Sequence, residues 1–254
     1  MSAGVAAIVP AAGVGRRLGA SVNKPYIELS GKPLLAHTLL VLQESPEIRW
    51  IILVTRQGEE RRARAIAEAY AITKLADVSS GGASRGESVA KGFSLLPKEA
   101  EWVLVHDGAR PCLTGKLIAR CIHKAKRHGA VACGMPAMLT VKAVDEQQVV
   151  RLTLDREHLW FVQTPQVFRS DWFGHALARA GNRYDRFPDD AAIIEAGGFP
   201  VRMVLGDPLN LKVTTQDDLL LAEAILDARV ERPRRKKPGA EAGKQKSEIR
   251  TRVR

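Results

Sequence analysis

The stretch VAAIVPAAGVGRRLGASVNKPY, residues 5–26, opens as an apolar strand, breaks into a loop of small residues and leads to a lysine. The apolar run of residues 5–9 is typical of a central strand in a parallel sheet that is covered on both faces. The small side chains after Pro10 let an anion approach backbone N–H groups, which can form a phosphate-binding nest. Arg17 and Lys24 add positive charge. We therefore interpret this stretch as a phosphate site at the end of a strand.

The spacing of the glycines and the lysine excludes two common phosphate loops. Leu18 stands where the third glycine of the dinucleotide fingerprint belongs, and Lys24 is followed by Pro25, not by the Ser or Thr of a P-loop. A glycine loop after a strand can also have a purely steric cause. The stretch resembles instead the signature of nucleotidyltransferases that activate sugars and polyols, in which a Gly-rich loop, an Arg and a Lys surround a nucleoside triphosphate.

The length of 254 residues suits one α/β domain, residues 1–228, followed by a tail at residues 229–254. Most of the net charge of +11 lies in the tail, where 11 Lys/Arg stand against 3 Asp/Glu, which leaves +3 for the domain. A Pro- and Lys/Arg-rich segment with few large apolar residues is predicted to be disordered. The tail could contact a nucleic acid or a membrane, but we favour a solvated extension without such a function.

Two further features of the composition bear on the cellular location. No apolar run approaches the roughly 20 residues that cross a bilayer, and the N-terminus lacks the pattern of a secretory signal. We therefore predict a cytoplasmic protein that is not embedded in a membrane. Cys112, Cys121 and Cys133 form no CxxC pair, so they suggest neither a zinc site nor a disulfide framework. We expect reduced, mostly buried thiols.

Strand and helix patterns alternate along the chain, which predicts a Rossmann-like α/β fold: a mostly parallel twisted sheet flanked by helices. The predicted strands are residues 5–9, 50–55, 72–78, 102–106, 130–135 and 200–205. The predicted helices are residues 33–43, 59–70, a segment ending near 96, and residues 114–128, 170–180, 189–196 and 215–228.

Two more loops follow predicted strands, a Gly/Ser turn at residues 79–88 and the sequence HDGARP at residues 106–111. In an open α/β sheet such loops lie at the carboxyl ends of strands, where ligands bind. We expect both to meet the first loop. Asp107 and Arg110 also have a plainer explanation, a turn-capping carboxylate beside a surface arginine.

Residues 138–154 change character, because β-branched residues alternate about a polar turn at residues 145–148. This pattern predicts a protruding β-hairpin arm. An isolated two-stranded ribbon is only marginally stable, so a partner subunit would cover it.

With these pieces assembled, residues 5–228 closely resemble the 2-C-methyl-D-erythritol 4-phosphate cytidylyltransferase family of the non-mevalonate isoprenoid pathway. Ordered motifs at these spacings are more specific than any one motif. The motifs are PAAGVGRR (10–17), Lys24, GGASRGESV (81–89), VHDGARP (105–111), Thr140, LDREHLW (154–160), QTPQ (163–166) and NLKVT (210–214). The chain departs from the family pattern at Pro25, Ala83 and Pro188; at Ala83 many members have Asp, which leaves one contact to the base or sugar open.

The resemblance implies that the phosphate of methylerythritol 4-phosphate attacks the α-phosphorus of CTP in line, giving 4-CDP-2-C-methylerythritol and pyrophosphate. Two polyanions must meet and extra charge must be tolerated in the transition state, so fixed cations should matter more than acid–base groups. By resemblance, Arg17 and Lys24 stabilise the transition state, and Arg156 and Lys212 hold the attacking phosphate. The resemblance also implies a homodimer formed through the arm, in which the two arms interlock, so Arg156 would come from the other subunit.

The resemblance also implies the remaining site residues and a metal. CTP would contact Pro10, Ala11, Ala12, Gly13, Gly15, Gly81, Gly82 and Ser88, although Ser88 could equally cap a helix. The acceptor would contact Asp107, Gly108, Arg110, Thr140 and Thr164. Mg²⁺ is expected to bind mainly through the triphosphate, with no dedicated protein site and with Asp107 as the one candidate ligand.

Competing hypotheses concern the acceptor and the activity itself. A cytidylyltransferase for another polyol phosphate, such as ribitol 5-phosphate, would share the triphosphate cradle, but Thr140 and the HDGARP motif favour methylerythritol phosphate. The joint presence of Arg17, Lys24, Arg156 and Lys212 argues against a catalytically idle nucleotide-binding protein. The tail lacks aromatic residues that stack on bases, which argues against a sequence-specific nucleic-acid binder.

Overall fold

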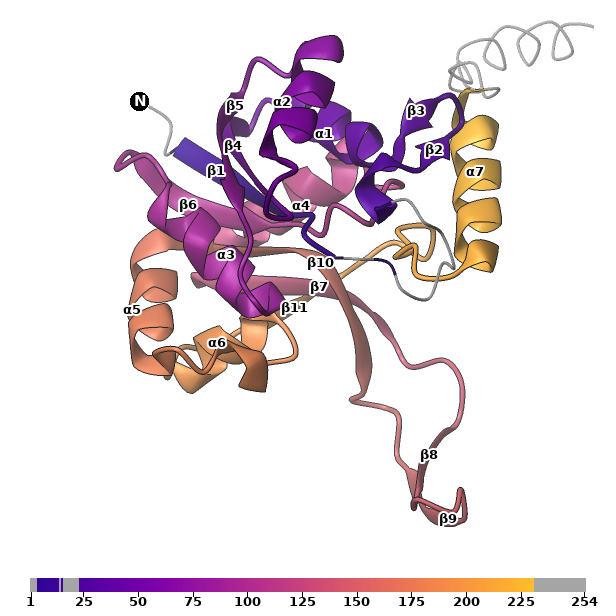
Figure 1. Cartoon of the computed structure of the whole chain (residues 1–254). Coiled ribbons are helices and arrows are strands. Elements are labelled where there is room, and N and C mark those ends of the chain that lie inside the picture. Colours follow the sequence, from indigo (N-terminus) through magenta and orange to yellow (C-terminus); the bar gives the residue numbers. More distant parts are fainter. Residues whose placement is uncertain (1–3, 14, 16–22, 231–254) are drawn as a thin grey trace, which may run out of the picture.

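The computed structural model describes residues 4–13, 15 and 23–230, and the structural statements below concern these residues. Their centre is one seven-stranded sheet made of β1 (Gly4–Pro10), β4 (Ile48–Thr55), β5 (Leu75–Ser80), β6 (Ala100–Val105), β7 (Ala130–Pro136), β10 (Trp160–Arg169) and β11 (Arg202–Leu205). The strands lie in the order β11-β7-β10-β6-β1-β4-β5. A short ribbon of β2 (Glu28–Leu29) and β3 (Lys32–Pro33) and a hairpin of β8 (Val141–Val144) and β9 (Val150–Leu154) complete the strands (Figure 1).

Helices cover both faces of the sheet, as the alternating apolar pattern predicts. The described helices are α1 (Leu34–Glu44), α2 (Glu60–Ala69), α3 (Arg85–Ser94), α4 (Gly115–His128), α5 (Ser170–Ala180), α6 (Asp190–Ala196) and α7 (Gln216–Val230). One core layer contains buried side chains of α1, α2 and α4, and the other contains those of α3, α5 and α6. Within β1, Val9 faces the first layer and Ile8 the second, as expected for a strand buried on both sides. The α/β fold with a mostly parallel sheet is thus confirmed.

Strand β10 is the exception to parallel pairing, and the sequence-based prediction missed it. It runs antiparallel to both β6 and β7, in the middle of the sheet. Proline inside a run argues against a central strand, because it has no N–H for the ladder. Here the register against β7 shifts between Val162 and Gln166, which accommodates Pro165.

The boundary of one predicted strand is also wrong. Residues 72–78 were expected to be extended, but β5 begins only at Leu75. Ala71 takes a left-handed φ of 52°, and the Ile72 N–H donates back to the Ala67 carbonyl over 2.8 Å. This is a Schellman-type end of α2, so Ile72 belongs to the helix stop.

The strand order places a ligand crevice beside β1. The chain runs outward from β1 to β4 and β5, and then returns to β6 on the other side of β1. Loops that leave neighbouring strands at such a switch point diverge and leave a crevice at the carboxyl edge. The Gly108 N–H donates to the Pro10 carbonyl over 3.1 Å, which ties the two loops together.

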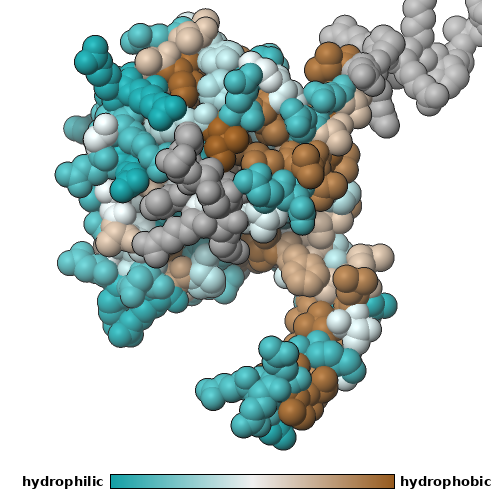
Figure 2. Space-filling view, turned by 45° about the vertical axis from the view of Figure 1, so that its right-hand side comes forward, coloured by the Kyte–Doolittle hydropathy of each residue, from teal (hydrophilic) through white to brown (hydrophobic). Residues whose placement is uncertain are grey.

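The predicted hairpin arm is confirmed. β8 and β9 pair antiparallel and project away from the body of the protein (Figure 1). Its strands leave large apolar side chains in solvent, with Leu139 77% exposed at its base and Leu152 56% exposed on β9. Figure 2 shows apolar side chains along the arm, beside hydrophilic ones near its tip.

Three other predictions have different outcomes. The thiols of Cys112, Cys121 and Cys133 are buried, as predicted. Within the described part of the chain, none of the helices combines the length and the apolar character needed to cross a membrane. Arg17 and residues 231–254 of the predicted tail lie outside the described residues.

Candidate active site

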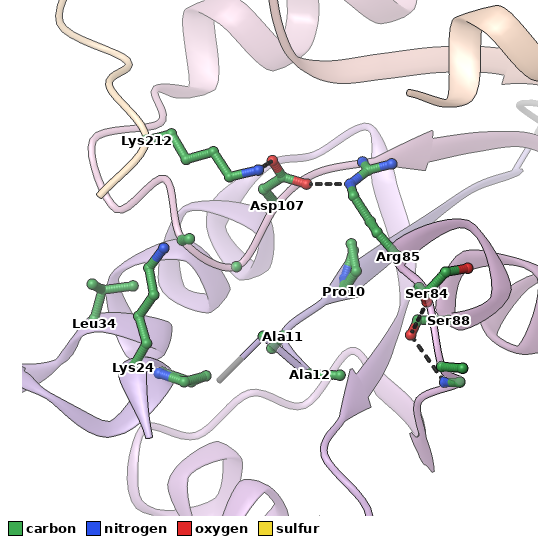
Figure 3. Close-up of a pocket in the computed structure, with 16 residues that line it drawn as sticks. Pro10, Ala11, Ala12, Lys24, Leu34, Ser84, Arg85, Ser88, Asp107 and Lys212 are labelled. Carbon is green, nitrogen blue, oxygen red and sulfur yellow. Dashed lines mark hydrogen bonds and ion pairs between the residues drawn. The ribbon is translucent and has the colours of Figure 1, made fainter. Parts of the chain in front are cut away.

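A pocket of about 340 Å³ lies at the carboxyl ends of β1 and β6 (Figure 3). Its volume falls within the usual range of small-molecule sites. The predicted site residues that line it are Pro10, Ala11, Ala12, Gly13, Lys24, Gly82, Ser88, Asp107, Gly108 and Lys212. The fold therefore brings residues from both ends of the chain to one place.

In the first loop, which follows β1, part of the backbone is already hydrogen-bonded to other parts of the protein. The Ala11 N–H donates to the Val54 carbonyl over 2.7 Å, and the Pro10 carbonyl accepts from Gly108. Ala11 therefore cannot supply the nest donor that the sequence suggested. Gly13 is exposed, and Gly15 has a φ of 63°, which favours glycine.

The second loop is shaped by a serine pair. Ser84, not Ser88, is the N-cap of α3, because its Oγ accepts from the Glu87 N–H over 3.1 Å. The capping hypothesis for Ser88 is thus wrong. Its Oγ donates to the Ser84 carbonyl over 2.9 Å and accepts from the Gly82 N–H over 3.0 Å. Ser88 therefore folds the loop against its own helix.

Gly81 allows the two loops to touch. A Cβ built there would lie 2.7 Å from the Ala12 Cβ and 2.8 Å from the Ser88 Oγ. Both distances are far shorter than a normal contact, so a side chain at this position would push the loops apart. Gly81 therefore shapes the site by letting the two loops pack together, and it does not itself line the pocket.

Lys24 is the first residue of a short 3-10 helix (Lys24–Tyr26), and its side chain is directed into the pocket (Figure 3). The residue is only 9% exposed. The turn is anchored by Tyr26, whose hydroxyl is hydrogen-bonded to the Thr55 Oγ1 at 3.1 Å and whose ring lies 4.1 Å from the guanidinium carbon of Arg62. These contacts fix the start of the Lys24 side chain.

Asp107 lies between two cations at the far wall of the pocket. Its Oδ1 accepts from the Arg85 Nε over 2.9 Å, and its Oδ2 lies 2.7 Å from the Lys212 Nζ. Burial acts to raise the pKa of this carboxyl, but Arg85 and Lys212 together hold it well below its usual range. Asp107 is therefore an anion at neutral pH, and it fixes Lys212 at the pocket wall.

Arg85 lines the same pocket and is held from behind by a second carboxylate. Its two terminal nitrogens donate to the oxygens of Asp190 over 3.0 and 2.8 Å, and Asp190 is completely buried. No sequence motif assigned a role to either residue. The sequence does show a charged residue, Asp190, beside the apolar residues of α6. A role for a buried charge can be recognised only once its partner is known.

Most of this chain is similar in sequence to known proteins. Residues 5–228 match the family model of 2-C-methyl-D-erythritol 4-phosphate cytidylyltransferase. The enzyme of that name from Alkaliphilus metalliredigens is 44% identical over 226 residues, which cover 89% of this chain and 94% of that protein. The one from Syntrophus aciditrophicus is 42% identical over 223 residues, 87% and 95% of the two chains.

Solved structures give the same result. The crystal structure of 4-diphosphocytidyl-2C-methyl-D-erythritol synthase from Anaerococcus prevotii superposes with a TM-score of 0.77 at 32% identity, covering 88% of this chain and 96% of that one. The 2-C-methyl-D-erythritol 4-phosphate cytidylyltransferase from Thermus thermophilus gives 0.73 at 31% identity, covering 88% and 99%. This chain belongs to the 2-C-methyl-D-erythritol 4-phosphate cytidylyltransferase family. It is therefore a nucleotidyltransferase that joins methylerythritol phosphate to the cytidylyl group of CTP in isoprenoid precursor synthesis, as the motifs predicted.

Two acceptor residues predicted for this cytidylyltransferase lie behind Asp107. The Thr164 Oγ1 accepts from the Asp107 N–H over 3.1 Å, and the Arg110 guanidinium donates to the Asn210 carbonyl over 2.9 Å. Thr164 is 4% and Arg110 8% exposed. The surface-arginine alternative is thus wrong, and both side chains support the pocket wall from inside the protein.

His106 precedes Asp107 but faces the interior. Its Nδ1 is hydrogen-bonded to the Thr164 Oγ1 at 3.1 Å, and the side chain is fully buried. Burial lowers the pKa of His106 to about 4, so the imidazole is neutral near pH 7. It has no direct path to a substrate in the pocket, and it supports Thr164 instead.

The two predicted residues of the arm are far from this pocket within one chain. Thr140 precedes β8 and Arg156 follows β9, and both are exposed. Arg156 donates a hydrogen bond to the Met138 carbonyl at the base of the arm. The fold of one chain therefore does not bring them together with Lys24 and Lys212.

Proposed function

We propose that CTP and the acceptor phosphate lie side by side in the pocket, and that fixed cations rather than an acid–base pair carry the transfer. The observation that supports this proposal is the convergence of Lys24 and Lys212 on one pocket at the switch point of the sheet. The two potential bases nearby, Asp107 and His106, have lowered pKa values, so neither takes up a proton readily at neutral pH.

In this proposal an oxygen of the acceptor phosphate attacks the α-phosphorus of CTP, and the bond to the bridging oxygen of the β-phosphate breaks to release pyrophosphate. Arg17 and Lys24 stabilise the charge that develops on the α-phosphoryl oxygens. Lys212 and Arg156 hold the attacking phosphate in line. Because a phosphate monoester has its second pKa near 6, the nucleophile needs no base.

The CTP side of the pocket is formed by the first two loops. We assign the cytidine and triphosphate to Pro10, Ala11, Ala12, Gly13, Gly15, Gly81, Gly82 and Ser88. Cytosine has a donor amino group beside two acceptors, so backbone groups of the second loop can distinguish it from uracil. Ser88 would act there by holding Gly82 in position, since its hydroxyl is already hydrogen-bonded within the loop.

The acceptor side is assigned to Asp107, Gly108, Arg110, Thr140 and Thr164. Asp107 can accept hydrogen bonds from acceptor hydroxyls, because each carboxylate oxygen has more than one lone pair. Arg110 and Thr164 would act by fixing Asp107. Thr140 and Arg156 would come from the arm of a partner subunit.

A homodimer formed through the arm would account for the exposed apolar side chains of the arm. Its large apolar side chains, among them Leu139 and Leu152, are exposed in one chain (Figure 2). A second copy of the arm would bury them and carry Arg156 and Thr140 to the acceptor pocket. We infer a two-fold assembly in which each acceptor site is shared between subunits.

A divalent metal ion, Mg²⁺ in our proposal, would depend mainly on the substrate for ligands. Among the described residues, no group of three or more His, Cys, Asp or Glu side chains could hold a metal. Both oxygens of Asp107 are already paired with Arg85 and Lys212, whose positive charges oppose a cation there. When bound to the triphosphate, the metal would neutralise charge and orient the α-phosphate.

We further propose that residues 1–228 form the catalytic domain of a cytoplasmic enzyme and that the basic tail at residues 229–254 is a solvated extension. Deletion of residues 232–254 should then leave turnover and assembly unchanged in the pyrophosphate assay and in sedimentation. A truncated protein that loses either would assign the tail a role, a nucleic-acid contact included.

The direct test is pyrophosphate release by the purified full-length chain with Mg²⁺, CTP and methylerythritol 4-phosphate. Parallel reactions replace CTP with UTP, ATP or GTP, and the acceptor with ribitol 5-phosphate. Release with CTP and methylerythritol phosphate alone is the expected result. Release with ribitol 5-phosphate would instead overturn the acceptor roles of Thr140, Arg156 and Thr164.

A further inference from the structure

We propose that Asp190 is a positioning residue for the acceptor site, acting through Arg85 on Asp107. This inference rests on the acceptor-binding role proposed above for Asp107. Asp190 itself is completely buried and touches the pocket only through the arginine. It thus forms the buried end of a chain of alternating charges, Asp190, Arg85, Asp107 and Lys212.

The geometry of Arg85 fixes this chain. The two terminal nitrogens donate to both oxygens of Asp190 over 3.0 and 2.8 Å, a bidentate pairing that sets the plane of the guanidinium. The remaining Nε–H then points at Asp107 Oδ1 over 2.9 Å (Figure 3). Because Arg85 begins α3 and Asp190 begins α6, the contact also joins two helices on the same face of the sheet.

The division of the donors of Arg85 determines what Asp107 can do. Because the two terminal nitrogens of Arg85 donate to Asp190, Asp107 receives only one hydrogen bond from Arg85. The Asp107 Oδ2 is then left for the Lys212 Nζ at 2.7 Å. Without the Asp190 carboxylate, the two terminal nitrogens of Arg85 would pair with Asp107, the nearest remaining carboxylate. Lys212 would lose its anchor, and fewer lone pairs of Asp107 would remain for acceptor hydroxyls. The acceptor side of the pocket would be disturbed, while Lys24 and the CTP loops would not.

The preceding residue offers a matched control. Asp189 is the N-cap of α6, with its Oδ1 accepting from the Ala192 N–H over 2.9 Å, and its Oδ2 accepts from the Gln166 Nε2 over 2.9 Å. It holds the same end of the same helix but is not hydrogen-bonded to Arg85. Substitution of Asp189 therefore reports the effect of loosening α6 alone.

The test is steady-state kinetics of the full-length enzyme with each substrate varied in turn. Asp190→Asn should raise the KM for methylerythritol phosphate about tenfold, the effect of losing one ionic contact, with little change in the KM for CTP. Arg85→Lys should do the same, because one ammonium group cannot bridge two carboxylates. The double variant should be no worse than either single variant, since both break one chain. Asp189→Ala should lower the melting temperature and leave both KM values unchanged.

A purely structural role predicts a different pattern. Asp190→Asn would then lower the melting temperature and the apparent kcat through loss of active enzyme, with both KM values unchanged, and that result would overturn the proposal. If Asp190→Asn does not fold, Arg85→Lys decides by the same KM comparison. A wild-type enzyme that releases no pyrophosphate would overturn the proposed function, and this inference with it.

Discussion

The pocket and the arm contribute proposed ligands to one reaction but are stabilised differently. Around the pocket, Lys24 and Asp107 are 9% and 6% exposed, and Asp107 is fixed by contacts from Arg85 and Lys212. On the arm, Arg156 is exposed on a two-stranded ribbon. In the proposed function, one chain therefore preorganises the nucleotide side by itself, whereas a partner subunit completes the acceptor side. Binding of CTP should then be insensitive to assembly, while turnover should depend on it.

The largest expected effect is on the pocket side. Lys24→Ala should lower kcat about 10³-fold, because a preorganised cation contributes most to the charged transition state, and should change the KM for CTP much less. Pyrophosphate release under varied CTP measures both. Lys124→Ala, on the exposed side of α4, is the matched control and should behave as wild type. An equal loss of CTP binding and turnover would make Lys24 a simple substrate anchor.

The comparison of pocket and arm also predicts that a substitution in the core and one on the arm lower the free energy of unfolding by unequal amounts. Leu53→Ala, in β4 and completely buried, should cost about 3 kcal/mol of unfolding free energy through cavity formation. Leu152→Ala, on the arm and 56% exposed, should cost less than about 0.5 kcal/mol in dilute monomer. Urea unfolding at two protein concentrations measures both, because the proposed dimer would make the stability of the arm variant depend on protein concentration. Equal costs in dilute solution would mean that the arm packs against its own chain.

On the arm itself, Arg156→Ala should lower kcat/KM for the acceptor about 10²-fold if it holds the attacking phosphate. The shared site has a sharper consequence. Equal mixing of inactive Lys24→Ala and Arg156→Ala chains should restore about a quarter of wild-type activity, since half of the dimers are mixed and each has one intact site. Mixtures that stay inactive after subunit exchange, verified by tagged pull-down, would place both residues in the same subunit.

The same contrast explains how much the sequence could predict. Local patterns found the loops of the pocket and the arm, because a strand, a small-residue turn and a hairpin each have a short-range signature. They could not find the pairing with Asp190 that holds Arg85 against Asp107. Arg85 and Asp190 are 105 positions apart, and only the crossing of the chain brings them within hydrogen-bonding distance. Strand β10 was missed for a related reason, since its Pro165 is tolerated only through a register shift against β7.

The last expected effect is on pH-dependent stability, and it again separates the body of the protein from the arm. Burial lowers the pKa of His106 to about 4, below its value in the unfolded chain. The unfolded state therefore binds the extra proton first as the pH falls, so stability is full above about pH 6.5 and declines towards pH 4. The loss between pH 7 and pH 5 should be about 2 kcal/mol, measured by urea unfolding at both values. His106→Asn should flatten that slope, and His158→Asn, on the exposed arm, should leave it as in wild type. A slope unaltered by His106→Asn would show that other groups cause the acid sensitivity, and that the body of the site does not depend on a neutral imidazole at this position.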